Sequence, residues 1–129
     1  GICILAGDLN MDQYYENFRV RLHAEYMGSD LCITICGGDS PHIGSVAIAE
    51  PRESLNGDGQ PSATVSTFNF LGHKDNEVAD AIAYTVSSQL RCRVVVLCGI
   101  HYNYVNADLL IQIETLSRTI VEDIIRNSK

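Results

Sequence analysis

The spacing of apolar residues changes once along this chain, and that change limits the folds that the chain can adopt. Up to Phe70 most apolar residues alternate with polar ones or form short β-branched runs, which is typical of strands. From Val78 the apolar residues recur every four positions, which is the period of an amphipathic helix. A chain that places its strands first and its helices later is typical of the α+β class.

Four strands are expected before the first helix, at residues 18–26, 31–36, 43–49 and 63–70. The first has its apolar residues on one side only, and a tight turn at 27–30 joins it to the second. Pro51 closes the third strand, and a polar, glycine-rich loop leads into the fourth. Strands joined by short links predict an antiparallel meander.

The remainder predicts a helix, a strand and a second helix. The first helix has an apolar face made of Val78, Ile82, Val86 and Leu90. The strand at 93–100 should return by a right-handed crossover and lie parallel to a strand of the same sheet. Asn106 is the expected N-cap of the last helix. The predicted order is therefore ββββαβα, with the helices on one face of a mixed sheet.

The apolar run Val94–Leu97 predicts a strand that is buried on both faces, although two helices cover only one face of a sheet. Something else must cover the other face. A second copy of the chain is the simplest candidate, so we expect a homodimer or a higher homo-oligomer.

A length of 129 residues suits one domain. We expect residues 18–129 to form it, with 1–17 as a peripheral lead-in that is helical around Met11–Glu16. The formal net charge of −7 disfavours nucleic acid and anionic membranes as partners, because a phosphate backbone is bound mainly by clustered Lys and Arg.

Five cysteines, without a CxxC pair, make a disulfide framework or a structural zinc site unexpected. Three of them lie in apolar runs, as free thiols do in a reducing compartment. No apolar stretch approaches the length of a membrane span, and the opening residues lack the basic leader of a signal peptide. These features predict a cytoplasmic protein.

Three histidines stand at glycine-marked ends of predicted elements, namely His42, His73 and His101. If the strands before His73 and His101 run in the same direction, both histidines lie at one edge of the sheet, where open α/β sheets bind ligands. Three imidazoles can hold a catalytic metal, but isolated turn histidines with ordinary hydrogen bonds are equally compatible with the sequence.

The segment Gly72-His73-Lys74, directly ahead of a helix, favours an anion site, because free backbone N–H groups, the helix dipole and a lysine act together there. Arg52 is a candidate for a further contact to a phosphate. Ser40 lies near His42, but the chain has no GxSxG elbow for nucleophilic catalysis. The residues by themselves indicate binding rather than catalysis, so we expect a protein that is not an enzyme.

Three blocks of the sequence resemble the LpdD-like family, over roughly residues 18–126. They are Gly37-Gly38-Asp39-Ser40-Pro41-His42-Ile43-Gly44-Ser45-Val46-Ala47, the pair Ala63-Thr64-Val65-Ser66 and Leu71-Gly72-His73-Lys74-Asp75, and Gly99-Ile100-His101-Tyr102. The family is described as a prenylated-flavin chaperone that accompanies gallate-type decarboxylases, with a fold similar to proteasome assembly chaperones.

The resemblance implies an accessory protein that binds prenylated flavin mononucleotide (FMN), or FMN itself, and serves a UbiD-type decarboxylase. The residues expected to hold the cofactor are His42, Gly44, Arg52, Gly72, His73, Lys74, His101 and Asn103. Tyr102 and Tyr104 are candidates for stacking on the flavin ring. Two alternatives stay open: an assembly module without a small ligand, and a small metal-dependent enzyme with a three-histidine site.

Overall fold

The computed structural model describes residues 10–70 and 76–128. Within these ranges the chain forms six strands and two helices in the order βββββαβα, so the predicted α+β class is confirmed. Five strands precede the first helix, where the sequence predicted four. The elements are β1 Asn10–Tyr15, β2 Val20–Met27, β3 Asp30–Gly38, β4 Ser45–Glu53, β5 Pro61–Asn69, α1 Asn76–Leu90, β6 Val94–His101 and α2 Ala107–Asn127.

The additional strand is β1, in the segment where a helix was expected. Met11 and Tyr15 pack against the core, whereas Asp12 and Tyr14 lie on the other side, so the segment alternates as a strand does. It pairs antiparallel with β2 along its whole length. The helical prediction was wrong because pairing with the open edge of β2 outweighed the weak local signal.

The strands form one sheet in the order β1-β2-β3-β6-β4-β5. The predicted four-stranded meander is interrupted, because β6 lies between β3 and β4. The pairing of β6 with β3 is parallel and its pairing with β4 is antiparallel, so the sheet is mixed as predicted. A continuous apolar strand gains most burial at the centre of a sheet, and β6 takes that place.

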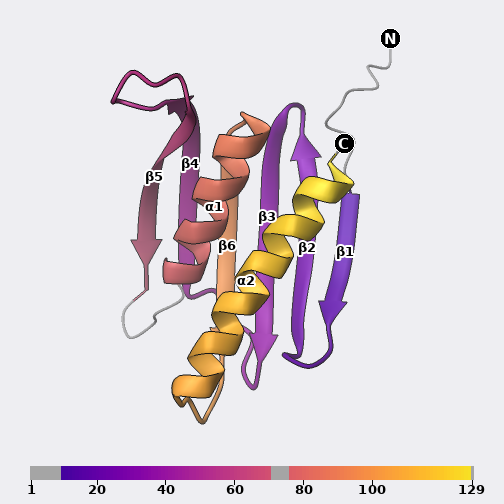
Figure 1. Ribbon diagram of the computed structural model, residues 1–129. Helices are drawn as coiled ribbons and strands as arrows, with labels where there is room; N and C mark the ends of the chain where they lie inside the picture. Colours follow the sequence, from indigo (N-terminus) through magenta and orange to yellow (C-terminus); the bar gives the residue numbers. More distant parts are fainter. Residues whose placement is uncertain (1–9, 71–75, 129) are drawn as a thin grey trace.

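Both helices lie on one face of the sheet, as predicted (Figure 1). They bury the inward-facing residues of every central strand, and each such aliphatic side chain stabilises the fold by about 1.5–3 kcal/mol. The core residues contributed by the helices are Ala79, Ile82, Ala83, Val86, Leu116, Ile120 and Ile124. Asn106 caps α2 as expected, because its side chain accepts a hydrogen bond of 2.9 Å from the N–H of Leu109.

The opposite face of the sheet is not covered by the described part of the chain. Val95 and Leu97 are only half-buried there, so the predicted burial of β6 on both faces is met on one face alone. Ile48, Phe68 and Phe70 are exposed beside them, by 52%, 63% and 45%. The sheet therefore presents an apolar patch over β6, β4 and β5.

β4 continues through Pro51 instead of ending before it. The pairing of β4 with β6 stops at Ala49, and from Glu50 to Glu53 the strand pairs with β5 alone. Proline lacks the N–H that a second neighbour would need, and it is tolerated where a strand has become an edge.

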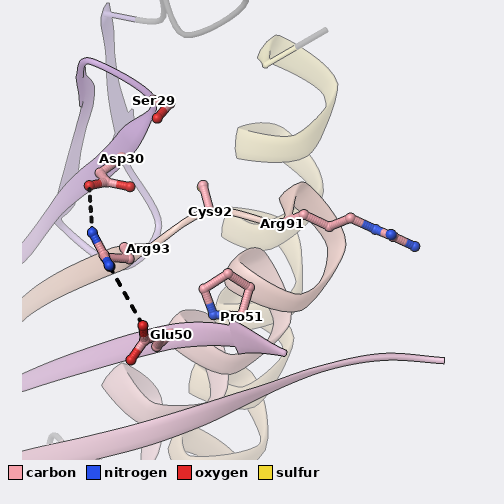
Figure 2. A pocket seen from close by; sticks show the side chains of 7 residues that line it. All are labelled: Ser29, Asp30, Glu50, Pro51, Arg91, Cys92 and Arg93. Carbon is pink, nitrogen blue, oxygen red and sulfur yellow. Dashed lines mark ion pairs between the residues drawn. The ribbon is translucent and has the colours of Figure 1, made fainter. Parts of the chain in front are cut away.

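At this end of the sheet Arg93 lies between two acids that belong to the neighbouring strands of β6 (Figure 2). Its guanidinium is 4.0 Å from the carboxylate of Asp30 and 3.7 Å from that of Glu50. The three side chains help to line a shallow hollow of about 250 Å³. Because all three are well exposed, the ion pairs add little to stability, and they leave the hollow nearly neutral.

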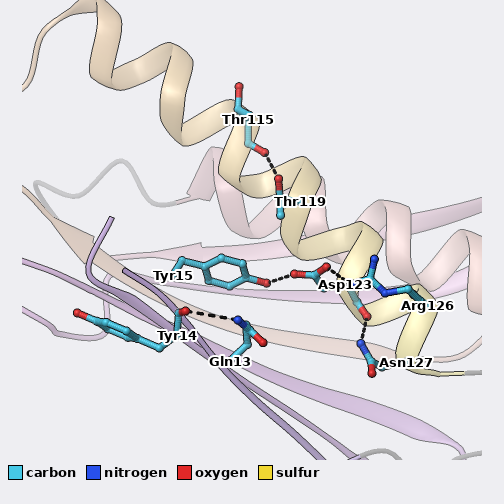
Figure 3. A network of polar contacts seen from close by, with 8 residues as sticks. All are labelled: Gln13, Tyr14, Tyr15, Thr115, Thr119, Asp123, Arg126 and Asn127. Atoms are coloured by element: carbon cyan, nitrogen blue, oxygen red, sulfur yellow. Dashed lines mark hydrogen bonds and ion pairs between the residues drawn. The ribbon is translucent and has the colours of Figure 1, made fainter. Parts of the chain in front are cut away.

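A polar contact ties the edge strand β1 to the last turns of α2 (Figure 3). The hydroxyl of Tyr15 donates a hydrogen bond of 2.6 Å to the carboxylate of Asp123, which also accepts one of 2.6 Å from Arg126. Burial of the phenol and its bond to Asp123 raise the pKa of Tyr15 well above its usual range. Burial therefore favours the neutral phenol, which is the form that donates to Asp123.

We expect Tyr15→Phe to lower the free energy of unfolding by about 1.5–3 kcal/mol, the range of a hydrogen bond to a charged acceptor. Urea denaturation measures the change. Tyr14→Phe is the matched control, because its ring is 49% exposed, and it should leave the unfolding midpoint in place. Equal midpoints for both variants would show that the contact with Asp123 does not hold β1.

Candidate functional site

At one end of the sheet, which we call the histidine edge, β3 and β6 end and β4 begins. Gly38 and His101, the last residues of β3 and β6, are paired across the sheet. The ring of His42, in the link before β4, lies 6.3 Å from the ring of His101, at an interplanar angle of 77°. The structure thus brings together two of the three predicted histidines.

Glycines allow the backbone segments at this edge to approach closely. A Cβ at Gly99 would overlap the carbonyl oxygen of His42, and a Cβ at Gly38 would overlap that of His101. Gly38 also has a φ of +78°, which disfavours other residues. The glycine-marked ends in the sequence therefore reflect chain crossings that position both histidines.

Asp39 ties three segments together at the same edge. Its carboxylate is 2.7 Å from the guanidinium of Arg19 and accepts a hydrogen bond of 2.7 Å from the N–H of Asn103. Its own N–H donates to the carbonyl of His101 at 2.6 Å. The bond from Asn103 and the adjacent Arg19 hold the pKa of Asp39 below its usual range.

Sequence reasoning assigned no role to Arg19, which lies in the strand that was expected at residues 18–26. Arg19 has a φ of +54° in the turn before β2, and its guanidinium lies 5.9 Å from the ring centroid of Tyr102. The hydroxyl of Tyr102 donates to the carbonyl of Phe18 at 2.5 Å. Tyr102 is therefore held by protein contacts, whereas Tyr104 is 91% exposed.

Arg52 does not lie at this edge, which corrects the sequence prediction. It is near the end of β4, whereas His42 precedes the start of that strand, so roughly 23 Å of extended chain separates Arg52 from Ser45. There it donates hydrogen bonds to the hydroxyl of Thr64 at 2.9 Å and to the carbonyl of Glu53 at 3.0 Å. One strand cannot present both of its ends at one edge.

Two other predicted residues have backbone roles. The N–H of Gly44 donates to the carbonyl of Cys98, and its carbonyl accepts from Phe70, both at 2.9 Å. Gly44 therefore extends the sheet and has no N–H left for a ligand. The N–H of Asn103 is bound to Asp39, which leaves its exposed side chain as the group that a ligand can reach.

Gly72, His73 and Lys74 lie outside the described residues. The described chain leaves the sheet beside Gly44, at Phe70, and resumes at the start of α1. Within residues 10–70 and 76–128, no group of three His, Cys, Asp or Glu side chains is arranged to hold a metal ion. The three-histidine hypothesis includes His73 and is not tested by this geometry.

Within the described ranges, Cys32, Cys36, Cys92 and Cys98 form no disulfide bond. Burial raises the pKa of Cys92, so it is not a reactive thiolate. No helix in the described part of the chain is long and apolar enough to cross a membrane.

The protein is thus an α+β domain in which two imidazoles from separate segments meet at one edge of a mixed sheet. A family model described as the prenylated flavin chaperone LpdD-like domain matches residues 14–129 of the chain. The protein therefore belongs to the family of LpdD-like prenylated flavin chaperones. A search of curated proteins found no match.

The Asp39 network predicts a specific response to pH. Because the folded pKa of Asp39 is lowered, its carboxylate stabilises the fold above its unfolded pKa of about 3.9, and this contribution is lost as the pH falls through the folded value. Asp39→Asn should therefore have a lower melting temperature than wild type at pH 7, and the difference between the two melting temperatures should narrow towards pH 3. Thermal melts across this range measure the gap, and a gap independent of pH would contradict the prediction.

Proposed function

We propose that the protein binds prenylated FMN, or FMN itself, at the edge marked by His42 and His101, and passes it to a UbiD-type decarboxylase in the cytoplasm. Membership of the prenylated flavin chaperone family gives the ligand class. The observation that carries the placement is the convergence of two imidazoles from separate segments, 6.3 Å apart, at the edge where β6 ends.

The residues of this edge fit a flavin in their chemistry. A flavin ring has carbonyl oxygens and ring nitrogens along one side, and imidazoles can donate to or accept from such groups. The guanidinium of Arg19 is already paired with Asp39, so in this proposal the cation for the phosphate is Lys74. Prenylated FMN, when bound by a decarboxylase, supplies the electron sink for loss of carbon dioxide.

A role as a carrier agrees with the exposure of the edge. His101 and Asn103 are exposed and His42 is half-buried, so a ligand held between them stays within reach of an acceptor protein. The sequence has no GxSxG elbow for a nucleophilic serine, and burial raises the pKa of the Cys92 thiol. We therefore propose a non-catalytic accessory protein.

Titration with FMN tests this placement. His101→Ala and Lys74→Ala should each weaken binding about tenfold or more, because each removes a hydrogen-bond donor to a polar or charged group. Arg52→Ala is the control: it removes a cation from the opposite edge and should leave the affinity unchanged. If Arg52→Ala weakened FMN binding while His101→Ala and Lys74→Ala did not, the proposed position of the flavin site would be overturned.

The alternative of an assembly module without a small ligand is favoured by one observation. Tyr104, Val105, Leu110 and Ile111 are all exposed, by 58–91%, on the loop before α2 and on its first turns. Apolar residues grouped on a surface are typical of protein contacts. If neither FMN nor prenylated FMN binds, the assembly-module hypothesis is favoured. Bound metal in the purified protein would instead favour the three-histidine enzyme.

We further propose that the uncovered sheet face binds a second copy of the chain. The apolar patch consists of Ile48, Phe68, Phe70, Val95 and Leu97, and an apolar patch is complementary to itself under a two-fold axis. Such pairing would complete the burial of β6, whose sequence is apolar on both faces.

Light scattering tests this pairing against the monomer mass of 14.2 kDa. Wild type should show about twice that mass, and Phe68→Glu should shift the protein towards the monomer by burying a charge in the interface. Leu55→Glu, which is 87% exposed in the loop between β4 and β5, is the matched control and should stay dimeric. A monomeric wild type at high micromolar concentration would refute the pairing.

A further inference from the structure

Ser45, the first residue of β4, has a buried hydroxyl without a partner. Its exposed fraction is 0%, and its Oγ makes no hydrogen bond with any residue that the structure describes. Native proteins rarely leave such a group unpaired, and each instance calls for an explanation. Ser87 and Ser117 are also buried, but they donate to the carbonyls of Cys92 and Ile113 at 2.7 and 3.0 Å.

The position of Ser45 relates this hydroxyl to the histidine edge. Ser45 is paired with Cys98 on one side and with Asn69 on the other, in the first row of β4 and three residues before His101 ends β6. Ser45 shares the helix-covered face with Ala47 and Ala49, which are likewise fully buried. Its hydroxyl therefore faces the helix layer just inside the edge where His42 and His101 meet.

The element above this row is the beginning of α1. The helix starts at Asn76, soon after β5 has ended at this edge, and runs back over β5, β4 and β6 (Figure 1). Its 15 residues are enough for a helix dipole, and the N–H groups of a first helical turn have no partner within the helix. Glu77, the acid of that turn, is exposed and leaves the inner side apolar.

We propose that the Ser45 hydroxyl and the first-turn N–H groups of α1 form the subsite for the phosphate of the flavin. This inference rests on the proposed function and adds a residue that is absent from the set predicted to hold the cofactor. A phosphate oxygen accepts a charge-assisted hydrogen bond from a serine hydroxyl, and a helix N-terminus favours an anion. The ribityl chain then spans the edge, and the ring system lies against His42 and His101.

The inference predicts opposite effects of Ser45→Ala on the free protein and on binding. In the free protein the substitution removes an unpaired buried polar group, so the melting temperature should stay equal or rise. In the complex it removes a hydrogen bond to a charged oxygen, so FMN should bind about tenfold or more weakly. A serine that only supports the fold would instead lower the melting temperature when replaced.

The experiment compares FMN with riboflavin, which lacks the phosphate, by titration of wild type and Ser45→Ala. Wild type should prefer FMN, and Ser45→Ala should reduce this preference about tenfold while leaving riboflavin affinity unchanged. Ser62→Ala is the matched control: Ser62 is a buried serine of the neighbouring β5 near the opposite edge, with its hydroxyl 3.3 Å from that of Tyr84. It should keep the full preference for FMN.

The outcomes separate this inference from the proposed function. If wild type binds neither flavin, the proposed function fails and the inference fails with it. If wild type binds FMN but Ser45→Ala keeps the same preference over riboflavin, the flavin site stands and the Ser45 subsite is refuted. Equal affinity of wild type for both flavins, or a marked loss of thermal stability in Ser45→Ala, also refutes the subsite.

Discussion

The arrangement of this protein depends on the pairing of β6 between β3 and β4. Parallel pairing with β3 sets Gly38 beside His101, and antiparallel pairing with β4 sets Cys98 beside Ser45. These two registers bring three separate loops to one edge of the sheet. A shift of β6 by one residue would turn its buried valines to the open face, so burial of Val94 and Val96 fixes the geometry of the edge.

The edge is organised by a carboxylate as much as by its histidines. Asp39 accepts from the loop that follows His101 and from Arg19, so the histidine-bearing loop is held to both β2 and β3. Because Asp39 neutralises the charge of Arg19, this arginine orders the loop but attracts anions only weakly. In the function proposed above, the phosphate is therefore bound by Lys74 and by directed hydrogen-bond donors and not by Arg19, which favours one ligand shape over general anion binding.

Local patterns predicted much of the fold but not the long-range pairing. The alternation at Val20, Leu22 and Ala24 and the four-residue spacing of α1 are visible in the sequence because burial of one face imposes them. The neighbours of β6 are decided by competition among strands, which no local spacing records. Arg52 was misplaced for a different reason, because it lies near the end of β4 whereas His42 precedes the start of that strand. The ion pair of Arg19 with Asp39 has no sequence signal, since neither residue alone indicates the other as its partner.

The course of α2 has a practical consequence for work with this protein. The helix begins next to the histidine edge and runs back along the sheet for 21 residues, about 30 Å, so its last turn lies beside β1 and the far ends of the strands (Figure 1). A dye, an affinity tag or a surface tether joined after α2 would therefore stay clear of the edge. Immobilised in this way, the protein would keep its histidine edge accessible from solution.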